Sequence, residues 1–292
     1  MKDTIFWNNH SWNIGGSCYE FSTPKIMGIL NCTPDSFFKQ SRVKQVSEAI
    51  AQAQKMMEDG ADIIDVGGYS SRPGAQNISE EEELARVIPV IQELKSQFPS
   101  MHISIDTFRQ RVAERACNVG ADIVNDISAW ELDKQMFDFI VETKIPYIVM
   151  HMPGTPVNMQ QRTTYKHVTM DVVQYLSEKL YQLRSEGVAD VAVDPGFGFG
   201  KTTSQNFILL KQIGMFKVLN CPILVGMSRK SMLQKSLNVS AAQSLNATTV
   251  VNTIAMQQGA SIIRVHDVRE AREACQLLQL VDQVNQPVIA HA

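Results

Sequence analysis

One unit recurs eight times along the chain: a short apolar run, a polar residue where it ends, and an amphipathic helical segment. The apolar runs lie at 26–30, 63–66, 102–105, 123–124, 147–150, 191–193, 223–225 and 262–265, and the helical segments at 45–58, from 79 onward, and at 109–119, 133–143, 165–187, 204–213, 243–258 and 268–284. Continuous apolar runs are typical of parallel strands buried on both faces. Eight units over about 265 residues predict an α/β fold, a single (β/α)8 TIM barrel. A doubly wound sheet is the alternative, but it usually has about five or six strands.

Composition and charge restrict the class of protein. Of the 292 residues, 44% are apolar and 20% are charged, which is typical of a globular chain. The net charge of -3 gives no basic footprint for nucleic acid. No apolar run reaches the roughly 18 residues of a membrane span, and the N-terminus lacks the apolar core of a signal peptide. We therefore expect neither a nucleic-acid nor a membrane partner.

Turn signals and cysteines define the remaining organisation. Asn8-Asn9-His10 and Gly15-Gly16 predict a short arm or hairpin over residues 1–24, followed by the barrel domain over 25–292. The five cysteines form no Cys-x-x-Cys pair, and an odd, scattered set is typical of the reducing cytoplasm. Cys32 lies beside a candidate site, but no base is near it in sequence, which argues against a catalytic thiol.

One helix has a clear start in the sequence. Ser79 and Glu82 have the spacing of a capping box, and the acidic residues of the first turn suit the helix dipole. Pro89 falls inside the same segment and is expected to kink it.

Polar side chains stand at the end of every predicted strand. In a TIM barrel these ends open on one face, which carries the active site. The strand-end residues are Asn31, Asp65, Asp106, Asn125, His151, Asp194, Ser228 with Lys230, and Arg264 with His266. One such residue is usually a satisfied loop contact, but a polar group at all eight ends predicts a catalytic mouth.

The strand-end residues form two chemical sets. Asp106, Asn125, Asp194 and Lys230 suit a flat heterocycle, because a carboxylate binds an N–H edge in bidentate fashion and an ammonium reaches a carbonyl oxygen or ring nitrogen. The second set suits a polyanion and consists of Arg72, Arg264 and His266, with Asn31 as an oxygen ligand for magnesium. His266 is alternatively a packed loop histidine, but its place two residues after Arg264 favours anion binding.

The loop DPGFGFGK at 194–201 follows the sixth strand. Glycines at 196, 198 and 200 permit close approach of a ligand to the main chain. We expect Asp194 to anchor a flat ligand, Phe199 to lie beside a second one, and Phe197 to support the loop. Lys201 is predicted to be a loop or helix-start residue, because Lys230 better fills the catalytic role.

Seven motifs together resemble one known family. They are GILNCTPDSF (28–37), DVGGYSSRPG (65–74), SIDT (104–107), NDI (125–127), DPGFGFGK (194–201), SRKS (228–231) and RVHDV (264–268). Each alone is weak, but seven in order at strand ends are specific. Over nearly all of residues 25–285 the chain resembles the dihydropteroate synthases, pterin-binding TIM-barrel enzymes.

The resemblance implies an activity. Such transferases join 6-hydroxymethyl-7,8-dihydropterin pyrophosphate to 4-aminobenzoate, giving 7,8-dihydropteroate and pyrophosphate in folate biosynthesis. It also implies Mg2+ as cofactor, sulfonamides as competitive inhibitors, and a homodimer. Apolar residues of the late helical segments, among them Met256, Leu277 and Val281, are candidates for the dimer face or for barrel-facing core.

The resemblance also implies residue roles. Asp106, Asn125, Asp194 and Lys230 would hold the pterin, with Ile127 and Met150 lining its pocket. Arg72, Arg264 and His266, with Asn31 and magnesium, would hold the pyrophosphate; Ser71, Arg72, Pro73, Phe199 and Ser228 would form the aminobenzoate site, and Gly226 completes the substrate-binding set. Asp106, Lys230, Arg264 and His266 are the implied catalytic residues.

The chemistry expected of these residues is an SN1-like displacement. Cations neutralise the charge that develops on departing pyrophosphate. The electron-rich dihydropterin delocalises the positive charge left on the exocyclic carbon, and the Asp106 carboxylate would stabilise it. A neutral amine then attacks, so no strong base or enzyme nucleophile is required.

Departures from the family pattern leave two alternatives open. The first loop reads FKQSR (38–42) where many members are glycine-rich, and Tyr69 and Ser71 replace a common Glu or Gln and Thr. Both loops are expected to act as lids. A catalytically silent pterin-binding paralogue is one alternative. A corrinoid-dependent methyltetrahydrofolate methyltransferase is the other, although it is expected to lack the SRKS and RVHD segments.

Overall fold

A ring of parallel strands forms the centre of the computed structural model, which describes residues 10–32, 42–70 and 77–284. The strands are β3 (Lys25–Asn31), β4 (Ile63–Gly67), β5 (His102–Asp106), β6 (Ile123–Asp126), β7 (Tyr147–Met150), β8 (Val191–Asp194), β9 (Leu224–Val225) and β10 (Ile262–Val265). They lie in the order β8-β7-β6-β5-β4-β3-β10-β9. A parallel bridge between Val193 and Ile223 brings the two ends of the sheet together, so the barrel is nearly closed. The predicted TIM barrel is confirmed.

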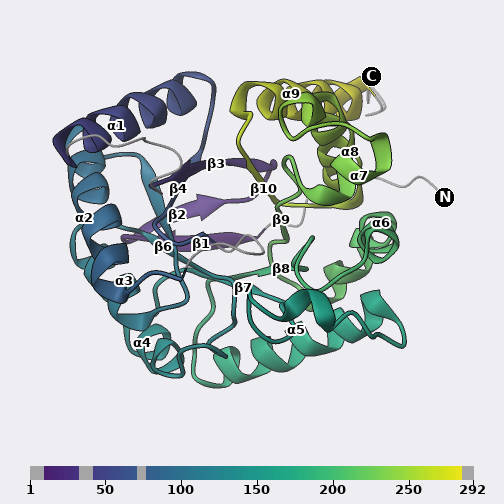
Figure 1. Ribbon diagram of the computed structural model, residues 1–292, viewed down its shortest axis with the longest axis horizontal. Helices are drawn as coiled ribbons and strands as arrows, with labels where there is room; N and C mark the ends of the chain where they lie inside the picture. The colour runs from purple at the N-terminus through teal and green to yellow at the C-terminus, as the bar shows by residue number, and fades with distance from the viewer. Residues whose placement is uncertain (1–9, 33–41, 71–76, 285–292) are drawn as a thin grey trace, which may run out of the picture.

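Helices surround the strands (Figure 1). They are α1 (Arg42–Glu58), α2 (Glu80–Gln97), α3 (Gln110–Asn118), α4 (Gln135–Thr143), α5 (Val168–Ser185), α6 (Thr203–Lys211), α7 (Ser231–Leu237), α8 (Leu245–Gln258) and α9 (Val268–Val284), with 3-10 turns at η1 (Met159–Gln161), η2 (Ile213–Leu219) and η3 (Ala242–Ser244). The sequence did not predict α7, because its seven residues are too few for a periodic apolar pattern. Within the described part of the chain, no helix combines the length and apolar character of a membrane span.

Two helices begin at side-chain caps. At α2 the Ser79 hydroxyl accepts the backbone N–H of Glu82 at 3.1 Å, as predicted, while the Glu82 carboxylate pairs with Arg86 at 2.6 Å. The helix continues through Pro89 to Gln97. At α6, Thr202 and Gln205 form a complete capping box, which the Thr-x-x-Gln spacing would have indicated.

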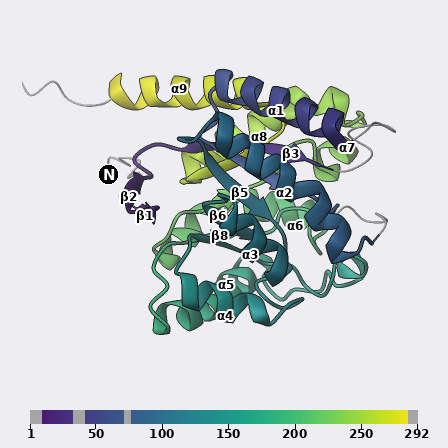
Figure 2. The ribbon, with the colours of Figure 1, turned by 90° about the vertical axis from the view of Figure 1, so that its left-hand side faces the viewer.

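The predicted N-terminal hairpin is present. Strands β1 (Ser11–Ile14) and β2 (Ser17–Glu20) pair in antiparallel register, and Trp12 and Phe21 are almost fully buried, with ring centroids 4.8 Å apart. These rings pack on residues at or near the starts of the barrel strands: Met27, Ile63, Ile123, Ile148, Ala192, Leu224 and Ile262. The hairpin therefore covers the barrel end opposite the strand C-termini (Figure 2).

Candidate active site

The strand C-termini bring most of the predicted site residues to one mouth. Asn31, Asp106, Asn125 and Asp194 stand on the ends of β3, β5, β6 and β8, and Arg264 lies in β10. In the sheet register, Asn31 is the partner of Gly67, and Gly67 is the partner of Asp106, so these residues share one level of the barrel. Ser71, Arg72 and Pro73 lie outside the described residues, as does the first loop from 33 to 41.

Arg264 connects the two chemical sets that the sequence separated. Its Nε donates to Asp65 Oδ2 at 2.6 Å, and one terminal nitrogen donates to Asp106 Oδ2 at 2.6 Å. These bonds use two of the five N–H groups of a guanidinium. The remaining donors permit contact with an anion while both carboxylates stay paired. Gly226 lies beside this arginine, where a Cβ would be in ordinary van der Waals contact with Arg264 Cβ at 3.8 Å.

Asp65 holds two site residues and was given no role from sequence. Its side chain is fully buried, and its Oδ2 also accepts Asn125 Nδ2 at 3.2 Å. One carboxylate oxygen thus orients both the amide of Asn125 and the guanidinium of Arg264. The available signal was a carboxylate inside the apolar run of β4, where a charge is retained only if it has a partner.

Asp194 ends β8, and Lys230 follows β9. Asp194 Oδ1 accepts the backbone N–H of Gly196 at 2.7 Å, which fixes the carboxylate at the start of the loop. Lys230 Nζ donates to the carbonyl of Phe197 and lies 4.7 Å from the ring centroid of Phe199. Phe197 is fully buried, as expected of a residue that supports the loop.

Ser228 and His266 are in direct contact. Ser228 Oγ lies 3.0 Å from His266 Nδ1 and accepts the backbone N–H of His266 at 3.2 Å. The neighbouring Arg229 makes a two-pronged ion pair with Asp267, at 2.9 and 2.5 Å. The SRKS and RVHDV segments are therefore tied together side by side.

Burial shifts the pKa values of the site. It raises the pKa of the Asp106 carboxyl, an effect that the Arg264 guanidinium opposes. It also raises the pKa of Asp194, which Lys230 and the Gly196 N–H oppose. Burial lowers the pKa of Lys230 to about 8, although the Asp194 carboxylate acts in the other direction. Burial disfavours the charge of Arg264 too, but Asp65 and Asp106 outweigh it and raise that pKa.

An apolar cluster forms the wall beside these polar groups. Ile127, Met150, Met152 and Met159 are buried together, and Phe108, Leu132 and Phe199 pack against them. Polarisable methionine and aromatic side chains suit a flat ring. Ile127 and Met150 are thus in contact with the same surface as Phe199, as a common substrate pocket requires.

The sequence also assigned no role to Glu83 and Arg109, two residues that hold the chain next to the second loop, which follows β4. Glu83 is fully buried in α2, accepts the Thr107 hydroxyl at 2.7 Å and pairs with Arg109 at 2.5 Å. Arg109 also donates to the carbonyl of Ile78 at 2.6 Å. In the sequence, Glu83 is only one member of an acidic run, so its burial had no local signal.

Magnesium requires oxygen ligands. Among the described residues, no group of three His, Cys, Asp or Glu side chains is placed to hold a metal ion. Magnesium often binds through only one or two protein oxygens, with substrate phosphates and water completing its shell. The half-buried amide of Asn31, level with Asp106, fits that kind of site.

Comparison with known proteins identifies the family to which this chain belongs. The model of the pterin binding enzymes matches residues 27–266. The chain belongs to the pterin-binding enzyme family. Within it, the dihydropteroate synthase of Escherichia coli (strain K12) is 42% identical over 266 residues, covering 90% of this chain and 94% of that protein.

Solved pterin-binding enzymes share the whole fold. A crystal structure of the Yersinia pestis dihydropteroate synthase in complex with a sulfonamide drug has a TM-score of 0.88 and 37% identity, covering 94% of this chain and 100% of that one. The Xanthomonas albilineans dihydropteroate synthase with 4-aminobenzoic acid has a TM-score of 0.86 and 34% identity, covering 94% and 98%. The resemblance carried by the seven motifs is confirmed.

Proposed function

We propose that this chain is a transferase that condenses 6-hydroxymethyl-7,8-dihydropterin pyrophosphate with 4-aminobenzoate, giving 7,8-dihydropteroate and pyrophosphate in folate biosynthesis. The observation that carries the proposal is the Arg264 bridge, which joins Asp65 to Asp106 at 2.6 Å each and leaves further donors open at the mouth. A carboxylate beside a cation with free donors supports the proposal, because the substrate has both a ring with N–H edges and a pyrophosphate.

In this proposal the polar side chains at the barrel mouth form hydrogen bonds with the edges of the pterin ring. The Asp106 and Asp194 carboxylates accept its N–H groups, the Asn125 amide donates and accepts, and Lys230 Nζ reaches the carbonyl oxygen or a ring nitrogen. Lys230 is already close to the Phe197 carbonyl, so its ammonium exchanges one oxygen partner for another. Ile127 and Met150 supply the apolar contact for the ring faces.

The pyrophosphate is assigned to Arg264, His266 and Arg72, with Asn31 and magnesium. Asn31 would supply an oxygen ligand to the metal, whose chemical contribution is to neutralise phosphate charge. Arg264 keeps its ion pairs with Asp65 and Asp106 and uses its remaining N–H groups for phosphate oxygens. The bond between Ser228 and His266 fixes the imidazole ring beside this arginine strand.

The aminobenzoate site is assigned to Ser71, Arg72, Pro73, Phe199, Gly226 and Ser228. Phe199 is half-buried against the apolar wall, and Lys230 Nζ lies over its ring, 4.7 Å from the centroid. Because the solved structures include a relative with a sulfonamide and one with 4-aminobenzoic acid, we propose that sulfonamides compete for the same position in this chain.

The proposed reaction is an SN1-like displacement. The bond between the exocyclic carbon and the pyrophosphate oxygen breaks, and the electron pair leaves with pyrophosphate, whose charge Arg264 and His266 stabilise. The ring delocalises the resulting positive charge, and the Asp106 carboxylate stabilises it. The amine nitrogen of 4-aminobenzoate then forms the C–N bond and loses a proton to solvent, so the chain needs no covalent nucleophile.

The decisive assay is release of pyrophosphate by the purified chain with dihydropterin pyrophosphate, 4-aminobenzoate and Mg2+. We expect release only when both substrates are present, with dihydropteroate formed in equal amount. Tight pterin binding without release would favour the silent paralogue and contradict the enzyme proposal. Methyl transfer from methyltetrahydrofolate to a corrinoid would favour the methyltransferase.

We also propose that the chain acts as a single barrel domain in the cytoplasm, with the hairpin as its cover. The five cysteines are free, which supports a reducing compartment.

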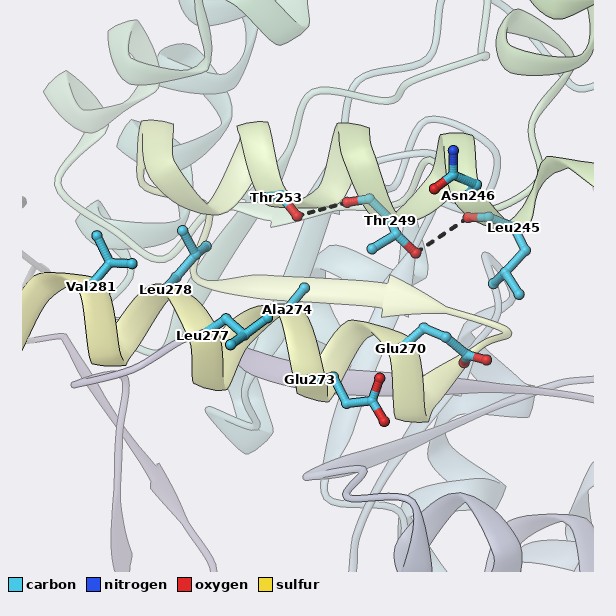
Figure 3. A pocket seen from close by; sticks show the side chains of 10 residues that line it. All are labelled: Leu245, Asn246, Thr249, Thr253, Glu270, Glu273, Ala274, Leu277, Leu278 and Val281. Carbon is cyan, nitrogen blue, oxygen red and sulfur yellow. Dashed lines mark hydrogen bonds between the residues drawn. The ribbon is translucent and has the colours of Figure 1, made fainter.

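A homodimer is proposed on the outer face of α8 and α9. A pocket of about 470 Å³ lies there between Leu245, Thr249, Glu270, Leu277 and Val281 (Figure 3). Leu277 is 63% exposed, and Leu280 and Val281 are 57% exposed, whereas Ala255 and Met256 are core. The late apolar residues thus divide between the core and an uncovered face, which supports association there.

A further inference from the structure

The side chain of Lys201 is buried, and its ammonium group has no part in the proposed reaction. Its side chain is only 3% exposed and lies between the end of β7 and the loop after β8. Its Nζ lies 2.9 Å from the carbonyl oxygen of Gly196, 3.1 Å from that of Phe199 and 3.0 Å from His151 Nδ1. One side chain therefore connects both ends of the loop 196–199 to the neighbouring strand.

The number of acceptors around Lys201 Nζ matches the number of donors on a charged lysine. An ammonium has three N–H donors, and the three nearest acceptors are two carbonyl oxygens and one ring nitrogen. Burial and the positive charge of Lys201 lower the pKa of His151 to about 2, so the ring is neutral and Nδ1 can accept. Burial also lowers the pKa of Lys201 itself, which the Asp194 carboxylate opposes.

The loop held in this way leaves little room for rearrangement. Gly196 has φ +71°, and a Cβ there would come within 2.0 Å of the His151 carbonyl oxygen. The Gly198 N–H donates to Asn206 Oδ1 at 2.7 Å, and the Tyr165 hydroxyl donates to the carbonyl of Gly200 at 2.9 Å. The path of the loop across the end of β7 is thus fixed from several sides.

This loop carries the parts that meet Lys230. The Phe197 carbonyl accepts from Lys230 Nζ, and the Phe199 ring lies beneath it. Asp194 precedes the loop in β8, where its backbone pairs with Met150 of β7, and its carboxylate also accepts the N–H of Gly196. Because the β7–β8 pairing holds the Asp194 backbone independently of the loop, we expect a change in the loop to move the Phe199 ring more than the Asp194 carboxylate.

We propose that Lys201 is a positioning residue, whose ammonium ties the loop after β8 to His151 and thereby sets the Phe199 ring for the second substrate. The charged and titratable groups around it are Asp194 and Lys230, together with His151, whose ring lies 4.9 Å from that of Tyr175. Lys201 touches no substrate in this role. The proposal rests on the proposed function only for its kinetic readout.

The first test is Lys201→Met in the full chain, since methionine has similar length but no donor. We expect the KM for 4-aminobenzoate to rise about tenfold, about 1.4 kcal/mol, while the KM for dihydropterin pyrophosphate changes less than about threefold. A uniform loss in both substrates, or wild-type values for both, would overturn the proposal.

Two variants of His151 separate the effect of the hydrogen bond to Lys201 on KM from the effect of lost packing on stability. His151→Asn keeps an acceptor near the Nδ1 position but loses the ring that packs on Tyr175. His151→Phe keeps a ring but removes the acceptor that Lys201 uses. We expect the Asn variant to retain the KM for 4-aminobenzoate despite a lower Tm, and the Phe variant to raise that KM. The reverse order overturns the proposal.

Amide hydrogen exchange tests the positioning role of Lys201 independently of enzyme activity. In substrate-free Lys201→Met we expect faster exchange at Gly198 and Phe199, whose N–H groups bond to Asn206 and Gly196, and unchanged exchange in β8. Unchanged protection of the loop overturns the positioning role even if the wild-type chain is active. Conversely, an inactive wild-type chain with the expected exchange pattern contradicts only the proposed function.

Discussion

At the scale of single residues, Asp106 is the group whose charge matters most. It is paired with Arg264 at 2.6 Å before any substrate is present, and this ion pair opposes the burial that raises the pKa of Asp106 to about 7. In the proposed reaction the same carboxylate faces a carbon that becomes positive. Its contribution is therefore expected to grow between the ground state and the transition state, which is the condition for a catalytic effect.

Asp106→Asn is expected to reduce kcat about 10²–10³-fold, the usual effect of losing one preorganised electrostatic partner. The KM for dihydropterin pyrophosphate should change less than about fivefold, because an amide still hydrogen-bonds the ring. Steady-state kinetics with both substrates measures the split, and the exposed Asp138→Asn on α4 is the control. Equal losses in kcat and in substrate affinity would remove this role from Asp106.

Lys230 predicts an alkaline limb in the pH profile. Burial lowers its pKa to about 8, so the ammonium is present below that pH and is lost as the pH rises through it. We expect kcat/KM for dihydropterin pyrophosphate to fall about tenfold per pH unit above 8. In Lys230→Arg the charge persists, so this limb should vanish even if activity is lower. An alkaline limb that survives Lys230→Arg would assign the titration to another group and contradict this role for Lys230.

At the scale of elements, the sequence predicted the strands, the hairpin and most helices, because their apolar periods are local. It also placed Asp106, Asn125 and Asp194 correctly, since a strand end is a position in sequence as well as in space. It missed the partnership of Asp65 with Arg264, which are 199 residues apart. Such pairings depend on closure of the barrel, and no local pattern contains them.

A substitution in the core of the N-terminal hairpin is expected to lower stability without changing catalysis. Trp12 is 2% exposed and packs with Phe21 against the starts of the barrel strands, far from the mouth. Trp12→Ala should lower the free energy of unfolding by about 3–5 kcal/mol through lost burial and a cavity. Denaturant unfolding measures the change, with the exposed Ser11→Ala of the same strand as control. Changed KM values in a folded Trp12→Ala chain would refute the separation of the two barrel ends.

At the scale of the whole molecule, sequence alone left the late apolar residues undecided between core and interface. The structure divides them between two helices: Ala255 and Met256 of α8 turn inward, while Leu277, Leu280 and Val281 of α9 turn outward. The outward set is continuous with the pocket between α8 and α9 and lies outside the ring of strands that carries the active site. Association through this face, as proposed, would leave the barrel mouth open.

Sedimentation of the wild-type chain should therefore give twice its mass of 32.6 kDa. Leu280→Glu combined with Val281→Glu introduces two charges that an apolar interface cannot pair, so the dissociation constant should rise at least about 100-fold. The variant should sediment as a monomer and retain kcat, because the mouth is untouched. Tyr181→Glu on α5, at a site that is 75% exposed, is the matched control and should remain dimeric. A monomeric wild type, or a double variant that stays dimeric, would show that this apolar face serves another purpose.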